Sequence, residues 1–269
     1  MAWQPCAATT ADEDSLFVCQ CFADVEAEGD GGCLPLRFAR MFIGKPYVAY
    51  TLEVNDDERL VVNTRQLDCT TLVENVAALT LCARMGRHTY GDFCQTLTTL
   101  RYREGVIDGY ESRLHYFSQW IADKQAMGIV SEIQEPNPPF SAIQRIDLHY
   151  MSSHPDAYKA LRAHPDLVGA IRALEQEMEG VTVRYIPKSR VGDSELLRSA
   201  VEDGDIIAIT SGKDGLDIAH LGLAVWRDDG LHLLNASQIH KRVVEEPMTL
   251  YQYLQRHPTH TGIRIIRIN

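Results

Sequence analysis

The sequence predicts an α+β fold in one domain, because helical and strand patterns occupy different parts of the chain. Apolar residues recur at helical spacing through much of the segment from residue 12 to residue 127. From residue 205 the pattern changes to short apolar strands separated by turns. Helices followed by a meander of strands favour a central antiparallel β-sheet with helices packed on it.

Each element is predicted from its own spacing and boundary residues. The helices are expected at 12–27, 36–43, from residue 69 onward, 92–100, 112–127, 155–163, 166–179 and 247–256. Extended segments are expected at 47–54, 60–62, 181–187, 205–210, 219–226, 231–236 and 262–268. The proline-rich segment 135–139 is expected to be a loop. We take residues 1–33 as an N-terminal extension packed on the main domain, which covers 34–269.

Composition excludes several classes of protein. The chain has 269 residues, of which 45% are hydrophobic, and this suffices for one large core or two modest ones. A net charge of -11 argues against nucleic acid or an anionic membrane as a partner. No apolar run approaches the roughly 20 residues that span a bilayer, so no membrane insertion is expected. We expect a monomer.

The first residues lack the basic and apolar regions of a signal peptide. This leaves two locations open: a cytoplasmic protein, or a periplasmic or extracellular protein whose leader has been removed. The seven cysteines are compatible with one free reactive thiol plus pairs. Cys19 and Cys21 do not have a usual zinc-ligand spacing, and we expect neither a metal nor a cofactor. Cys82 and Cys94 are expected to be packing residues.

The most informative cysteine is Cys69, which stands where a loop turns into an amphipathic helix. Asp68 immediately precedes that helix and is a plausible N-cap. Amide N–H groups and the positive end of the helix dipole converge on the first turn, so a thiol placed there is expected to ionise more easily than usual. A thiolate is a good nucleophile. The alternative is a buried structural cysteine, as most free cysteines are.

A cysteine nucleophile needs a base, and His220 has the best context among the ten histidines. In a strand, His220 shares a face with small residues such as Gly222, whereas Leu221 and Leu223 form a core face. The small neighbours are expected to leave room for a helix end or a substrate.

A turn at 227–230 then reverses the chain and brings Asn235 to the face of His220. One register places Asn235 opposite Gly222 and diagonal to His220, and another places it directly opposite His220. Both leave the two side chains within reach of each other. An amide oxygen beside an imidazole fixes its tautomer, so Cys69, His220 and Asn235 are a candidate catalytic triad. The alternative is three unrelated polar residues.

Several motifs in order resemble the NlpC-type cell-wall hydrolases of papain-like fold. The matching residues are Pro46-Tyr47, Asp68-Cys69, His220-Leu221-Gly222 and Asn235-Ala236-Ser237. A closer resemblance is to the N-acetylmuramoyl-L-alanine amidase-like branch. It rests on 44–48, 51–53, 67–75, 110–116 and 215–222, and the similarity spans roughly residues 34–269.

The chain departs from the wider superfamily at two positions. Thr70-Thr71 follows the cysteine where Ser-Gly is common, and the third polar residue is Asn235 where histidine is frequent. The first difference fits the amidase-like branch and casts doubt on endopeptidase specificity. The second still supplies a hydrogen-bond acceptor.

The resemblance implies a papain-like NlpC-type fold and hydrolysis of the amide between N-acetylmuramic acid and L-alanine. Peptidoglycan fragments (muropeptides) would be the substrate, and no metal is required. Cys69 would attack the carbonyl with His220 as base and acid, and its backbone N–H together with the Tyr47 hydroxyl would stabilise the oxyanion. The alternatives are a γ-D-glutamyl-diaminoacid endopeptidase, a catalytically silent muropeptide-binding module and, more distantly, a lipid acyltransferase.

Other polar residues are candidates for substrate binding. Arg113, His115 and Tyr116 are expected on one helix, where Arg113 would pair with a peptide carboxylate; an ordinary solvated helix face is the alternative. Ser152, with Ser153 and His154, is a candidate for the same wall. Asp217 is expected to orient His220, contact substrate or simply end a turn. Asp68 is a candidate for a second role toward a substrate amine.

Overall fold

The computed structural model describes residues 10–29 and 31–269. The helices are α1 (Thr10–Glu28), α2 (Leu34–Arg40), α3 (Cys69–Arg84), α4 (Tyr90–Arg101), α5 (Phe117–Ala126), α6 (Tyr150–Ser153), α7 (Lys159–Ala163), α8 (Leu167–Gln176), α9 (Ser194–Arg198) and α10 (Leu250–Gln255). The strands are β1 (Val130–Ile133), β2 (Ala142–Arg145), β3 (Thr182–Pro187), β4 (Ile206–Ser211), β5 (Ile218–Arg227), β6 (Gly230–Ser237), β7 (Arg242–Glu245) and β8 (His260–Ile268).

All strands join one antiparallel sheet in the order β2-β3-β8-β4-β5-β6-β7. Strands β4 to β7 form the expected meander. The last strand, β8, lies between β3 and β4, and β1 pairs with the same strand. The predicted α+β class with helices on an antiparallel sheet is therefore confirmed.

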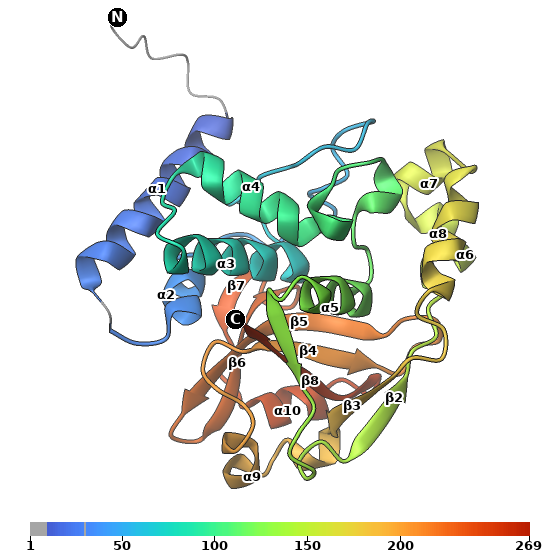
Figure 1. Cartoon of the computed structure of the whole chain (residues 1–269). Coiled ribbons are helices and arrows are strands. Elements are labelled where there is room, and N and C mark those ends of the chain that lie inside the picture. Colours follow the sequence, from blue (N-terminus) through green and yellow to red (C-terminus); the bar gives the residue numbers. More distant parts are fainter. Residues whose placement is uncertain (1–9, 30) are drawn as a thin grey trace, which may run out of the picture.

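Helices cover both faces of this sheet (Figure 1). On one face, α3 packs on β5 and β6, and α1, α2, α4 and α5 surround it. On the other face α9 and α10 enclose a second core. Strand β5 contributes side chains to both cores: Leu221, Leu223 and Val225 enter the first core, and Ala224 enters the second. Burial of each large apolar side chain contributes about 1.5–3 kcal/mol.

Helix α3 is enclosed on nearly all sides. Its apolar residues Leu72, Val76 and Leu79 are each 0% exposed. Such burial holds the first turn of the helix, with Cys69, at a defined position above the sheet. A third cluster, which includes Met151, Leu161 and Ile171, lies under α6 and α8.

Most predicted elements are present with shifted ends. The loop at 135–139 is confirmed, as are the helices near 12–27, 92–100 and 247–256 and the strands from residue 181 onward that were expected. The N-terminal helix α1 contributes Val18, Cys21 and Phe22 to the first core. Cys6, one of the seven cysteines of the sequence, lies outside the described residues. Within the described segments, no helix is both long and apolar enough to cross a bilayer.

Two local predictions are wrong. The segments 47–54 and 60–62 form turns and irregular loop instead of strands, apart from a bridge at Pro46 and Tyr47. Acidic and polar residues at 55–59 interrupt the pattern there. The helix expected at 112–127 begins only at Phe117, because Tyr102 and Arg113 form a β-bridge that holds the preceding segment extended. Strands β1, β2 and β7, each four residues long, were not expected.

Candidate active site

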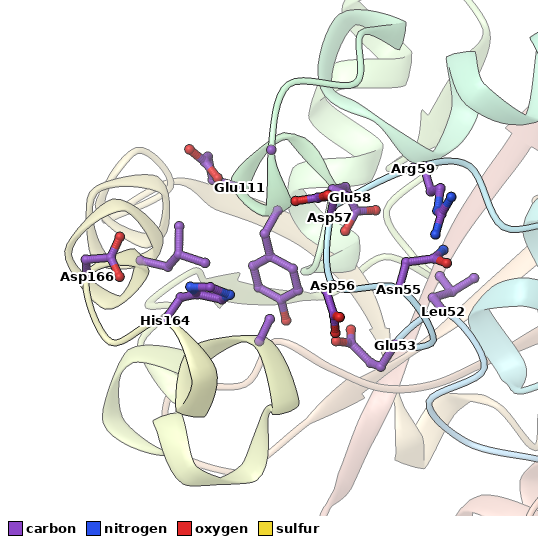
Figure 2. A pocket seen from close by; sticks show the side chains of 14 residues that line it. Leu52, Glu53, Asn55, Asp56, Asp57, Glu58, Arg59, Glu111, His164 and Asp166 are labelled. Carbon is purple, nitrogen blue, oxygen red and sulfur yellow. The ribbon is translucent and has the colours of Figure 1, made fainter.

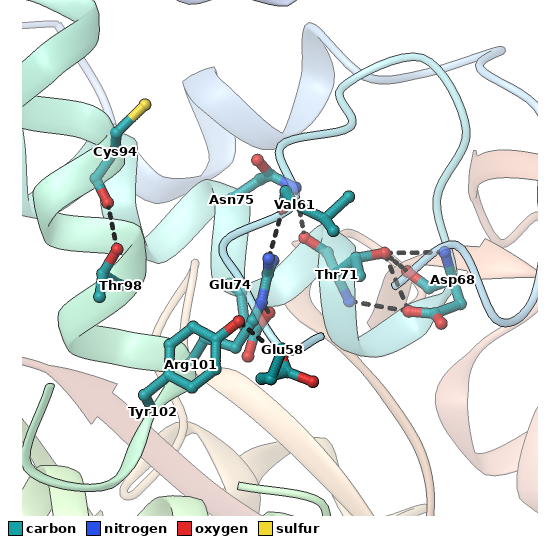
Figure 3. A network of polar contacts seen from close by, with 10 residues as sticks. All are labelled: Glu58, Val61, Asp68, Thr71, Glu74, Asn75, Cys94, Thr98, Arg101 and Tyr102. Atoms are coloured by element: carbon teal, nitrogen blue, oxygen red, sulfur yellow. Dashed lines mark hydrogen bonds and ion pairs between the residues drawn. The ribbon is translucent and has the colours of Figure 1, made fainter. Parts of the chain in front are cut away.

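Cys69 is the first residue of α3, as the sequence predicts, and Asp68 is its N-cap. The Asp68 carboxylate accepts a hydrogen bond from the Thr71 N–H at 2.8 Å. In return, the Asp68 N–H donates to the Thr71 hydroxyl at 2.9 Å. This reciprocal capping box, seen in Figure 3, defines where the helix begins and therefore where the sulfur lies.

The chain entering α3 is fixed by a second segment. Tyr47 forms a parallel bridge with Leu67, and the Leu67 N–H donates to the Pro46 carbonyl at 3.0 Å. Burial and the nearby Cys69 and Asp68 raise the pKa of Tyr47 to about 12. Its hydroxyl therefore keeps its proton at neutral pH and can act as a donor beside Cys69.

His220 on β5 and Asn235 on β6 are hydrogen-bonded to each other, with 3.0 Å between His220 Nε2 and Asn235 Oδ1. Leu223 pairs with Leu234, so the same register places Asn235 opposite Gly222 and diagonal to His220. Of the two registers left open by the sequence, the diagonal one is confirmed.

A buried carboxylate fixes the orientation of the Asn235 amide. Asn235 Nδ2 donates to Glu246 Oε1 at 3.1 Å, and a carboxylate only accepts hydrogen bonds. The Asn235 oxygen must therefore face His220, whose Nε2 must carry the proton. In the neutral ring, Nδ1 then has the free lone pair.

Cys69 and His220 line one cavity of about 190 Å³ together with Thr70, Phe117 and neighbouring residues of the β5 strand. The Leu221 backbone and the Thr70 side chain lie near enough to the Cys69 sulfur to act on its pKa. Because Leu221 directly follows His220, the start of α3 lies next to the strand that carries the imidazole. The structure thus brings Cys69, His220 and Asn235 together.

The expectation that Cys69 ionises easily is wrong for the resting state. Burial, with the negative charge of Asp68, raises the pKa of Cys69 to about 12. Burial also lowers the pKa of His220 below its usual 6.5, although the bond to Asn235 and the charges of Glu246 and Asp68 act in the opposite direction. Desolvation exceeds the effect of the helix N-terminus here, so a neutral thiol faces a neutral imidazole near pH 7.

The small residues beside His220 do not leave the open space that the sequence suggested. A Cβ at Gly222 would lie 2.7 Å from the Leu233 side chain and from the Leu234 carbonyl oxygen. Ala224 is buried in the second core. The glycine therefore permits close packing of β5 and β6, and the cavity lies at the other end of the strand, next to Ile218 and Ala219.

Arg113 lies in an adjoining cavity of about 190 Å³, which shares Thr70, Leu114 and His115 with the first. It lies in an extended segment before α5, which corrects its predicted place on a helix. The guanidinium forms an ion pair with Glu53 and lies 3.7 Å from Glu58.

His115 and Tyr116 occupy the same extended segment. His115 Nε2 donates to the Tyr110 carbonyl at 2.9 Å, and burial, followed by the charge of Arg113, lowers the pKa of His115 to about 3. Tyr116 lines the first cavity, but its hydroxyl donates to Glu175 at 2.7 Å and accepts from the Met151 N–H. The hydroxyl is thus part of the support for this segment.

Asp217 and Ser152 have structural partners. Asp217 lines the first cavity, but its carboxylate accepts from the Ser118 N–H at 2.9 Å in the first turn of α5. Ser152 lies in α6, where its N–H donates to Glu175 at 3.1 Å. Among the described residues that line the Cys69 cavity, Ser152 does not occur, so its predicted place in that wall is wrong.

A buried ion pair lies beside the cap of α3. Arg101 of α4 donates to Glu74 of α3 at 2.8 Å, and both side chains are 2% exposed (Figure 3). Arg101 also donates to the Val61 carbonyl. These contacts fasten α3 to α4 and to the loop before it.

A further cavity of about 320 Å³ continues from the Arg113 cavity, with which it shares Leu52, Glu53 and Tyr110. Its wall is acidic, and Figure 2 shows Asp56, Asp57 and Glu111 among the side chains around it. Neither Cys69 nor His220 belongs to the lining of this larger cavity.

Across residues 10–29 and 31–269, no group of three or more histidine, cysteine or acidic side chains is arranged to hold a metal ion. Cys19 is exposed and Cys21 is buried, so they do not share an environment. Cys82 is buried and Cys94 half-buried, and both pack in the first core as expected.

The sequence reasoning missed Glu246, which is 1% exposed and bonded to Asn235. Its only sequence signal was a polar pair, Glu245-Glu246, at the end of a strand that was itself not expected. A buried acid is visible only once β7 is paired with β6.

Comparison with known proteins identifies the family to which the chain belongs. A family model described as N-acetylmuramoyl-L-alanine amidase-like matches residues 37–263. The chain belongs to this AmiA-like family. No curated protein matches it.

Solved structures of similar proteins include a Bacteroides uniformis N-acetylmuramoyl-L-alanine amidase, which is 39% identical with a TM-score of 0.80 over 86% of this chain and 97% of that one. A Bacteroides fragilis protein named as a proposed xylanase is also 39% identical, with a TM-score of 0.80 over 86% of this chain and 99% of that one. A Legionella pneumophila protein has the same fold at 20% identity, with a TM-score of 0.72 over 96% of this chain and 95% of that one. The AmiA-like chain is thus similar to one protein named as an N-acetylmuramoyl-L-alanine amidase and to one named as a xylanase.

Proposed function

We propose that this AmiA-like protein is a cysteine hydrolase of papain-like NlpC type that cleaves the amide between N-acetylmuramic acid and L-alanine in muropeptides. The observation that carries the proposal is the hydrogen bond of 3.0 Å between His220 Nε2 and Asn235 Oδ1, because the His220 ring that makes it lines the same cavity as Cys69. A nucleophile, an adjacent base and a residue that orients the base form a thiol-hydrolase site.

The reaction begins from the neutral pair. As the Cys69 sulfur attacks the lactyl carbonyl carbon, His220 Nδ1 accepts the thiol proton, so the thiolate forms only when substrate is present. The carbonyl oxygen becomes an oxyanion, which the Cys69 N–H and the Tyr47 hydroxyl stabilise. The first amides of a helix have no partner within it and are therefore available for this purpose.

Collapse of the tetrahedral intermediate breaks the C–N bond. The imidazolium gives its proton from Nδ1 to the departing L-alanine nitrogen, and the muramoyl group remains on Cys69 as a thioester. His220 then takes a proton from water, whose oxygen attacks the thioester. The muramic acid leaves with a free carboxylate, and the thiol regains its proton.

The adjoining cavities extend the site beyond Thr70, in the direction of Asp68. Arg113 is our candidate partner for a carboxylate of the stem peptide, because it lines this cavity; the peptide would share its guanidinium with Glu53 and Glu58. His115 separates the two cavities and, being neutral, contributes shape and hydrogen bonding without charge. Asp68 lies where it can contact the peptide amine, in addition to capping α3.

Glycoside hydrolysis, which the name of one similar protein suggests, does not fit the same cavity. Glycosidases commonly use two carboxyl groups that flank the scissile bond. Among the side chains that line the cavity of Cys69 and His220, Asp217 is the single acid, and its carboxylate is bonded to the Ser118 N–H.

The proposal is tested by digesting defined muropeptides and identifying products by mass spectrometry. We expect a sugar with a free muramic acid carboxylate and a peptide that begins with L-alanine. Release of an L-Ala-γ-D-Glu dipeptide would instead show an endopeptidase. Binding of muropeptides without any product would show a silent binding module.

The pH dependence gives a second test. Because the active form of His220 is neutral and burial lowers its pKa, kcat/KM is expected to rise with pH along a limb whose midpoint lies below 6.5. The activity should then remain level into mildly alkaline solution, since the Cys69 thiol stays protonated there. A midpoint above 6.5, with the fold intact by circular dichroism at each pH, would contradict this assignment.

A further inference from the structure

The hydrogen bonds around His220 continue beyond Asn235 to a buried acid. Glu246 directly follows β7, and its N–H donates to the Leu233 carbonyl at 2.8 Å. Its carboxylate accepts from Asn235 Nδ2 through Oε1 at 3.1 Å. Through Oε2 it contacts His240 Nε2 at 3.2 Å, and His240 is 34% exposed.

We propose that Glu246 is a positioning residue of the candidate active site, which fixes the Asn235 amide and thereby the tautomer of His220. This inference rests on the proposed function for its catalytic meaning. The geometry on which it stands is the continuous chain of hydrogen bonds from His220 through Asn235 to Glu246.

The need for such a residue follows from the near symmetry of a carboxamide. Asn235 can rotate by half a turn and exchange its oxygen and nitrogen with little change in shape. In the rotated form Nδ2 would face His220 Nε2, which would have to accept, and the ring proton would move to Nδ1. His220 could then no longer receive the Cys69 proton at that atom. A carboxylate at the far side of the amide excludes this form, because it offers no donor to the amide oxygen.

Burial of both side chains enforces one orientation of the Asn235 amide. Asn235 is 0% exposed and Glu246 is 1% exposed, so water does not compete for the amide. A buried hydrogen-bonding group left without a partner costs about 1–3 kcal/mol. The rotated amide would leave its oxygen facing the Glu246 carboxylate, with an unfavourable contact between two acceptors.

The charge of Glu246 has a second effect, on the imidazolium that forms during the reaction. Glu246 raises the pKa of His220 and so opposes the effect of burial. The same charge acts on Tyr253 of α10, whose ring centroid lies 6.3 Å from that of His220.

Other titratable groups surround the pair. Those that face His220 or Glu246 are Asp68 and Cys69 at the start of α3, His232 of β6, His240 in the turn before β7, Tyr253 of α10, and His260 of β8, which is itself near His257 and Lys188. His232 contacts only the backbone oxygen of Glu246, at 2.9 Å, and His260 is held neutral near pH 7 because burial lowers its pKa to about 4. Through Oε2, the Glu246 carboxylate connects Asn235 to the half-exposed His240.

The first experiment reads the tautomer directly. In protein with ¹⁵N-labelled histidine, the His220 signal is assigned by its loss in His220→Gln. We expect the Nε2–H tautomer in the unmodified protein and a shift of population toward Nδ1–H in Glu246→Ala. An unchanged tautomer in Glu246→Ala would overturn the proposal. This readout needs no turnover, so it stands even if the amidase reaction proves wrong.

The second experiment measures kinetics on a muropeptide substrate. Glu246→Ala is expected to lower kcat by about 10- to 100-fold, as removal of an outer partner that orients a reacting group commonly does. KM should change less than about twofold, because Glu246 lies outside the cavities that would hold substrate. A kcat equal to that of the unmodified protein would overturn the catalytic meaning of the proposal.

Two matched variants test the effect of the charge and control for folding. Glu246→Gln keeps the size of the side chain but adds an amide donor, which can serve the rotated Asn235, so the Nδ1–H tautomer should become populated in this variant too. Loss of the negative charge should also move the acid limb of kcat/KM to lower pH. An unmoved limb would contradict the effect of the charge. Glu245→Gln is the control: this neighbouring acid is paired with Arg40 and Arg227. It should alter neither the tautomer nor the pH profile, and a change equal to that in Glu246→Gln would also contradict the proposal.

Discussion

Replacing Cys69 with alanine is expected to reduce amide hydrolysis by roughly 10⁴-fold or more, because no other group can form the thioester. The helix cap should remain, since Asp68 and Thr71 bond to each other without the Cys69 side chain. The thermal unfolding midpoint should therefore change little. The measurement is peptide release from a defined muropeptide by the purified variant.

The matched control is Cys19→Ala, which removes an exposed thiol from α1. It should retain full activity. Equal peptide release by the Cys69→Ala protein and the unmodified one would show that the sulfur is not the nucleophile. Alkylation is a weaker test, because the raised pKa of the Cys69 thiol slows reaction with iodoacetamide near pH 7 in the absence of substrate.

Removing the buried acid of α3 is expected to have the largest effect on stability. In Glu74→Ala the Arg101 guanidinium would remain 2% exposed without its carboxylate. Breaking a buried ion pair in this way costs about 3–5 kcal/mol of the roughly 5–15 kcal/mol that stabilises a typical domain. Urea unfolding followed by circular dichroism would measure the loss.

A surface ion pair of similar length is the control. Arg103 and Glu177 are 2.9 Å apart, with side chains 35% and 52% exposed. Glu177→Ala should cost less than about 1 kcal/mol. In the double variant Glu74→Leu, Arg101→Met, apolar packing should recover a large part of the loss. Equal costs for the two single variants would mean that burial does not determine the strength of the Glu74–Arg101 contact.

The sequence predicted best those helices and strands whose pattern of apolar residues lies within the element itself. Helix α3 could be predicted because its apolar residues recur at helical spacing, and β5 and β6 because each is a mostly apolar run of eight or more residues next to a turn. Strands β1, β2 and β7 have four residues each, too few for a period to be recognised. The extended segment before α5 depends on the bridge from Tyr102 to Arg113, a contact between separate segments that no local pattern encodes.

The residues of the candidate site likewise fall into those that a local pattern predicts and those that depend on contacts between separate segments. Cys69, His220 and Asn235 were predicted because a helix start positions the first and a strand pairing positions the other two. Both features can be recognised from the local sequence. Glu246 was not, because its role depends on two strands lying side by side. The pKa of Cys69 was predicted with the wrong sign because the sequence shows the helix end but not the depth of burial.

Strand β8 lies between β3 and β4, although it is the last strand along the described chain. During synthesis on a ribosome, β4 to β7 emerge earlier, and one edge of β4 then remains without a partner. The hairpin that carries His220 and Asn235 can therefore settle against a completed sheet only after residues 260–268 have been made. We expect nascent chains that stop before His260 to be inactive and, with an unpaired edge, inclined to associate with one another.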